Sequence, residues 1–182
     1  QVTSYSRSMK LAKNKKIDAA VGAYQNEVAQ VLYPEMHLDA DLVSALYKKG
    51  SVSPWEGEKS LEGKHVGWIK GYSISKYITK NFKIHEFKDR EKAVRQVDAG
   101  NLDFFLDGEW ELNSELEKSY VDKGEYIISK LKQLNTYVVF ADNARGKYFK
   151  KLYDDGIEKL LVNGRLKKLF DKWGSKIPFI ES

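Results

Sequence analysis

The chain has 182 residues, of which 42% are hydrophobic and 31% are charged, a balance that supports globular units with cores of their own. It contains no cysteine, which excludes structural disulfides and cysteine-ligated zinc, and no run approaches the ~20 apolar residues of a membrane span. The net charge is +5, but the lysines form short clusters between apolar helical positions, so we expect a solvated surface, no nucleic-acid partner and no direct membrane insertion.

Helices and strands alternate along the chain, which is typical of α/β proteins. In chain order, the pattern predicts a helix at 6–14, strands at 16–24 and 42–47, a loop at 51–63, a strand at 66–70, a helix at 73–81, a strand at 83–87, a helix at 90–99, a strand at 101–108, a helix at 109–116, two strand-like runs within 125–141, and helices at 147–163 and 166–173. Glycines follow the last two helices, as is common at helix ends. The chain opens at Gln1 without a secretory signal, and we interpret it as a mature or trimmed product.

A helix–strand pattern occurs twice. The segments "MKLAKNKKIDAAVG" (9–22) and "VRQVDAGNLDFFLDG" (94–108) both run from an apolar helix face through a polar turn and an aspartate into a strand. The matching positions include Met9 with Val94 and Asp18 with Asp103. We therefore expect two similar lobes, each containing one copy.

The stretch "HVGWIKGYSISKYI" (65–78) reads as a strand, a glycine turn and the start of a helix. Ser73 is a good N-cap residue, so the helix at 73–81 can cap itself. The free N–H groups of its first turn can equally bind an anion. The residues of this stretch leave both interpretations open.

No catalytic or metal-binding motif is present. The three histidines, His37, His65 and His85, lack the spacing of a zinc site, and neither a nucleophile elbow nor a phosphate-binding loop occurs. We therefore assign no catalytic residue, metal ligand or cofactor.

Three strand ends carry polar or aromatic residues suited to a small-molecule site. They are "GAYQNE" (22–27) with Tyr24 and Asn26, "KGYS" (70–73), and "FLDGEW" (105–110) with Asp107. Each also has a purely structural interpretation, since Asp107 can cap the helix that follows and Tyr24 can pack in the core. The sequence does not show whether the three ends converge.

Taken together, the chain resembles the extracellular solute-binding protein family 3, whose members deliver amino acids and similar solutes to bacterial transporters. The segments that carry the resemblance are "RSMKLAKNKKIDAAVGAYQNE", "SLEGKHVGWIKGYS", "VRQVDAGNLDFFLDGE" and "YFKKLYDDGIEKLLVNGRLKKLFDKWG". The resemblance implies a two-lobed α/β fold of type II, with mixed sheets flanked by helices and a ligand cleft between the lobes. It places one lobe at 1–47 plus 137–182 and the other at 48–136, and it implies that the strand, helix and strand that open family members are missing.

The resemblance also implies a site. The turn at Gly71, Tyr72 and Ser73 would present N–H groups and a hydroxyl to an acidic group of the ligand. Tyr24 and Asn26 would serve the first lobe, Asp107 the second, and Trp110 would form an aromatic wall. Two positions depart from the family pattern. Ala29 lies where amino-acid binders carry a carboxylate-clamping arginine, and Gly108 lies where their amine-binding acid is expected.

These features predict a periplasmic or extracytoplasmic protein that binds a small polar solute for an ABC transporter. Two alternatives are the input domain of a membrane-bound sensor and a dehydratase-type enzyme that uses Asp107 or Glu109 as its acid or base. The sequence does not identify the ligand.

Overall fold

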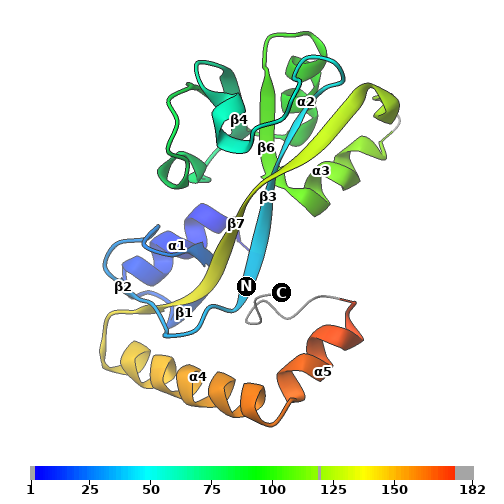
Figure 1. Ribbon diagram of the computed structural model, residues 1–182. Helices are drawn as coiled ribbons and strands as arrows, with labels where there is room; N and C mark the ends of the chain where they lie inside the picture. Colours follow the sequence, from blue (N-terminus) through cyan, green and yellow to red (C-terminus); the bar gives the residue numbers. More distant parts are fainter. Residues whose placement is uncertain (1–2, 119, 175–182) are drawn as a thin grey trace. The chain divides into compact units, whose positions relative to one another are not determined.

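A computed structural model describes residues 3–118 and 120–174, and the chain divides into two compact units (Figure 1). Unit 1 contains residues 1–40 and 134–182, and unit 2 contains residues 41–133. The chain passes from one unit to the other within β3 (Asp39–Lys48) and within β7 (Tyr126–Ala141). The boundaries of 47 and 136 given above fall within the same two strands.

Unit 1 is a small antiparallel sheet with three helices. Its remaining elements are α1 (Tyr5–Lys13), β1 (Ala19–Tyr24), β2 (Val31–Leu32), α4 (Ala144–Val162) and α5 (Arg165–Lys172). Both β1 and β2 pair antiparallel with β7, with Ala19 opposite Phe140. The core joins one face of α1 to the sheet, because Met9 and Ala12 pack with Ala20, Ala23 and Val139.

Unit 2 has a mixed sheet whose strand order is β3–β6–β4–β5. Its other elements are η1 (Gly57–Leu61), β4 (His65–Ile69), η2 (Ile74–Tyr77), β5 (Lys83–Phe87), α2 (Arg90–Asp98), β6 (Phe104–Gly108), α3 (Glu109–Leu116) and η3 (Lys123–Glu125). Strand β4 is parallel to both of its neighbours, whereas β3 is antiparallel to β6. The core includes Leu46, Val94, Val97, Phe105 and Leu112, and it joins α2 and α3 to the sheet.

Most of the predicted elements are confirmed. The repeated helix–strand pattern forms α1 with β1 in unit 1 and α2 with β6 in unit 2, with the apolar helix faces buried in both cases. Two predictions are wrong. The segment at 73–81 forms only the single 3₁₀ turn η2, and the two expected runs at 125–141 form one continuous strand, β7.

Candidate functional site

A buried ion pair lies at the end of β6. Asp107 is only 2% exposed, and its Oδ2 accepts a hydrogen bond from Nε of Arg90 at 2.8 Å. Its Oδ1 accepts from the backbone N–H of Gly108 at 2.9 Å. Burial raises the pKa of the Asp107 carboxyl, although the Arg90 guanidinium and the Gly108 N–H act in the opposite direction. The charge of Asp107 is thus balanced from within the protein.

Tyr72 and Glu111 complete this polar cluster, which we call the Arg90 cluster (Tyr72, Arg90, Asp107 and Glu111). Burial raises the pKa of Tyr72, and the charge of Asp107 raises it further. The carboxylate of Glu111 lies against Gly108, since a β-carbon on that glycine would be 2.2 Å from Glu111 Oε2. The cluster therefore combines one cation with two carboxylates, so its formal charge is negative and favours a cationic partner.

Sheet topology explains why these residues meet. Tyr72 follows β4, Arg90 begins α2 just after β5, and Asp107 is the last residue but one of β6. Because β4 is parallel to both β5 and β6, all three lie at the carboxyl ends of neighbouring parallel strands. Ligands of open α/β sheets bind at this edge.

A further polar group lies beside the ion pair. Ser44 on β3 is directly opposite Asp107 in the antiparallel register, so the two side chains share one face of the sheet. The Oγ of Ser44 is fully buried and has no hydrogen-bond partner within the described part of the chain. Buried hydroxyls normally have a partner, so this face has unused hydrogen-bonding capacity.

The turn after β4 differs from the sequence prediction. Ser73 precedes the four-residue η2 and makes no side-chain cap hydrogen bond within the described residues. Self-capping of a helix at 73–81 is therefore wrong, and an anion site based on that helix loses its physical basis, because the aligned N–H groups of an α-helix are missing. Gly71 has a φ of 98°, which a side chain would strain. Ligand binding by Gly71 and Ser73 stays a prediction.

The other predicted ligand-binding residues are Tyr24, Asn26 and Trp110, of which Trp110 belongs to unit 2 like the Arg90 cluster. Tyr24 and Asn26 belong to unit 1. There the backbone N–H of Tyr24 donates to Glu27 at 3.0 Å, and the same carboxylate oxygen accepts from the hydroxyl of Tyr5 at 2.5 Å. Trp110 lies in the first turn of α3 with 76% of its surface exposed. Of the predicted set, Tyr72 and Asp107 interact within the Arg90 cluster, and the ligand-binding roles of all the predicted residues stay predictions.

Sequence reasoning missed Arg90, and it noticed Glu111 only as one of three acids, with Asp107 and Glu109, that follow an apolar strand, without placing it in the predicted site. Arg90 looked like an ordinary first residue of a helix, and its partner is 17 positions away in sequence. One signal was present for Glu111: it lies three residues after Gly108, the spacing at which a glutamate reaches back to the residue that caps its helix.

Across residues 3–118 and 120–174, no group of three or more histidine and acidic side chains is placed to hold a metal ion. None of the helices in those residues combines the length and the apolar character needed to cross a membrane.

The fold is that of the two-lobed periplasmic binding proteins. Neither a protein-family model nor a curated protein matches the sequence. Among solved structures, an amino-acid ABC transporter substrate-binding protein from Streptococcus pneumoniae bound to L-arginine has a TM-score of 0.66 and 18% identity over 94% of this chain and 74% of its own. A putative ABC transporter binding component from Wolinella succinogenes complexed with lysine has a TM-score of 0.67 and 15% identity over 94% of this chain and 76% of its own. A histidine kinase sensor domain similar to periplasmic binding proteins has a TM-score of 0.71 and 13% identity over 96% of this chain and 77% of its own. At these identities the likeness establishes the fold, and it leaves the ligand open.

Proposed function

We propose that the protein is a non-enzymatic solute-binding domain that binds a small, amino-acid-like solute and delivers it to an ABC transporter outside the cytoplasm. The observation that carries the proposal is the Arg90 cluster, a buried polar group at the carboxyl edge of parallel strands in a periplasmic binding protein fold. Structural neighbours of this fold are described as bound to arginine, histidine or lysine, which supports an amino-acid-like ligand.

The charge of the cluster suggests how unit 2 would contact the solute. Asp107 is almost fully buried and paired, so we assign it the task of positioning Arg90. Glu111 is partly exposed and makes no hydrogen bond or salt bridge within the described residues, so its carboxylate is the group offered to an ammonium or guanidinium group of the ligand. Tyr72 would pack against the ligand beside it. Tyr24 and Asn26 would contribute from unit 1, with Gly71, Ser73 and Trp110 as further contacts in unit 2.

A second candidate is the sensor domain of a membrane-bound signalling protein. It is favoured by the likeness to a histidine kinase sensor domain, which has a TM-score of 0.71. Both candidates need the same ligand site, and they differ in the partner that reads the ligand-bound state. Binding to a transporter or to a kinase module therefore separates them, whereas ligand affinity does not.

The test is a thermal-shift screen of the purified chain against arginine, lysine, histidine, glutamine, glutamate and putrescine. A ligand that binds only the folded state raises the melting temperature as its concentration exceeds Kd. We expect a shift with at least one amino acid that carries a cationic side chain, with no consumption of the ligand over hours. A complete lack of shifts in folded protein contradicts the proposal, and conversion of the ligand into a product indicates an enzyme.

Two matched variants locate the site. Glu111→Gln and Glu109→Gln each remove one charge from the first turn of α3, and glutamine retains the ability to cap a helix at position 111. The shift should disappear in Glu111→Gln and persist in Glu109→Gln. An equal loss in both variants would point to the general charge of the turn instead of a contact by Glu111.

A further inference from the structure

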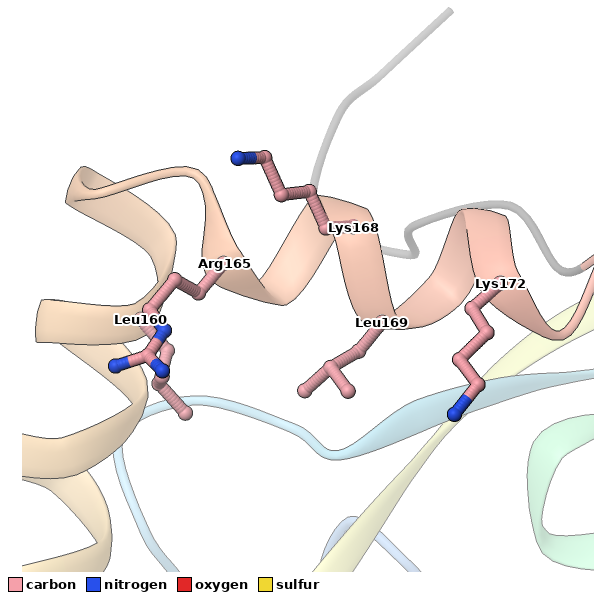
Figure 2. A pocket seen from close by; sticks show the side chains of 5 residues that line it. All are labelled: Leu160, Arg165, Lys168, Leu169 and Lys172. Atoms are coloured by element: carbon pink, nitrogen blue, oxygen red, sulfur yellow. The ribbon is translucent and has the colours of Figure 1, made fainter.

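A cavity lies in unit 1, where the end of α4 meets α5. It has a volume of about 530 Å³, within the range of pockets that hold small molecules. Its lining residues are Leu160, Arg165, Lys168, Leu169 and Lys172 (Figure 2). The cavity is thus lined by three cations and two leucines, with no acidic residue among those named.

Among the described residues, the three cations have no acidic side chain as a salt-bridge partner. Lys167, on the same helix, forms an ion pair with Asp171 at 2.8 Å. Arg165, Lys168 and Lys172 form no salt bridge within residues 3–118 and 120–174, and the recorded contact of Lys172 is with the ring of Trp173, 5.6 Å from its centroid. Like charges on successive turns of one helix repel each other, and a bound anion would relieve that repulsion.

The apolar part of the lining restricts the kind of anion. Leu169 is 49% exposed, although a leucine on a small helix is usually turned to the core. Figure 2 shows the side chains of Leu169 and Lys172 pointing to the same side of α5, with Arg165 beside Leu160 at one end of the helix. An anionic head next to the cations would place a hydrocarbon chain over the leucines.

We propose that this cavity binds a soluble anionic amphiphile, a molecule with a carboxylate or comparable anionic head and a short hydrocarbon chain. Arg165 and Lys172 bind the head, and Leu160 and Leu169 contact the chain. This site does not depend on the proposed solute-binding function, since all of its lining residues belong to unit 1 and none belongs to the Arg90 cluster.

Lys167 provides a matched control. It is on the same helix and carries the same charge, but it pairs with Asp171 at 2.8 Å and is not among the residues that line the cavity. Binding that depends on the cavity should therefore distinguish Lys167 from Arg165 and Lys172. Binding that depends only on the overall charge of α5 should not distinguish them.

The experiment is isothermal titration calorimetry of the full chain with sodium decanoate, below the concentration at which it forms micelles. Saturable binding is expected, with an affinity lowered roughly tenfold in Arg165→Gln and in Lys172→Gln, since a hydrogen bond to a charged group contributes about that factor. Lys167→Gln should change the affinity by less than about twofold, which is the size expected of a screened surface charge. Leu169→Ala should lower the affinity for decanoate, because the variant lacks part of the apolar surface that contacts the chain. Acetate should not bind, because it has no hydrocarbon chain to contact the leucines.

Three outcomes would overturn the proposal. The first is no binding of decanoate by wild-type protein whose circular dichroism is that of a folded chain. The second is an equal loss of affinity in the Arg165, Lys167 and Lys172 variants. The third is binding to vesicles of anionic phospholipid without binding to decanoate, which would identify α5 as a membrane-surface helix.

Discussion

Replacing Arg90 with methionine should destabilise unit 2 through the carboxylate that it leaves behind. Methionine keeps most of the apolar stem of arginine and removes the guanidinium. Asp107 would then keep one backbone hydrogen bond, from Gly108, and lose its cation while remaining buried. Removing one partner of a buried ion pair costs about 3–5 kcal/mol. Because the Arg90 side chain is 33% exposed and water reaches it, we expect the lower end, about 3 kcal/mol.

The loss of unfolding free energy in Arg90→Met should depend on pH in a defined direction. Burial already raises the pKa of Asp107 in the folded wild-type protein, and removing Arg90 removes the main opposing influence. The folded variant therefore holds a proton to higher pH than the unfolded chain, whose aspartates titrate near pH 3.9. When the folded state binds more protons, the free energy of unfolding falls as pH rises. The penalty of Arg90→Met should be larger at pH 7 than at pH 5.

The assay is urea unfolding followed by the fluorescence of Trp68, which is buried in unit 2, at both pH values. The matched control is the double variant Arg90→Met with Asp107→Asn, in which no charge remains to be buried. The double variant should recover much of the loss and show little difference between pH 5 and pH 7. An unfolding free energy for Arg90→Met equal to that of the wild type, or a double variant no more stable than the single one, would refute the reasoning.

Two more predictions test local contacts. Asn143 caps α4 by accepting a hydrogen bond from the N–H of Gly146 at 2.8 Å, so Asn143→Ala should lower the unfolding free energy by about 1 kcal/mol. Ser4→Ala is its control at α1, where no side-chain cap bond is made, and should cost less than about 0.5 kcal/mol in the same urea titration; equal losses would contradict the capping argument. Burial, followed by the hydrogen bond to Asp98, raises the pKa of Tyr126 to about 12, so the folded state keeps this proton while the unfolded chain ionises near pH 10. The free energy of unfolding should therefore fall between pH 10 and pH 12. Tyr126→Phe should reduce that fall, as measured by the pH dependence of the melting temperature. An identical pH dependence in the variant and the wild type would contradict the role of Tyr126.

Much of the fold could be predicted because local pattern and tertiary packing agree. In α1 and α2, the apolar residues that mark one helix face, such as Met9 and Val94, are the ones that the structure buries. The strands of the two repeated segments are followed or preceded by turns whose glycines and aspartates are visible in the sequence. For such elements, the periodicity of burial is already present in the order of residues.

The segment at 73–81 shows where local pattern fails. Ile74 and Ile78 have helical spacing, and both are buried, yet the chain does not form an α-helix. Its backbone groups are bound by distant side chains instead. The carbonyl of Tyr77 accepts from Lys132 at 2.7 Å, and the N–H of Thr79 donates to Glu58 at 2.9 Å. Since Lys132 and Glu58 also pair with each other, a tertiary network satisfies groups that a helix would have used, and no local pattern predicts it.

The Arg90 cluster could not be predicted either, because its members also come from distant parts of the sequence. Position 107 on β6 illustrates this. Successive side chains of a strand point to opposite faces of the sheet, so a carboxylate at position 107 and one at position 108 would have different neighbours. In the structure, Asp107 shares the face of Ser44 and pairs with Arg90. The space beside position 108 is filled by Glu111, which would be 2.2 Å from any β-carbon there. Asp107 is thus a structural partner of Arg90, while the carboxylate of Glu111, from the first turn of α3, lies beside Gly108. Under the proposed function, the ligand chemistry of unit 2 depends on Glu111, which the folded chain brings beside Gly108.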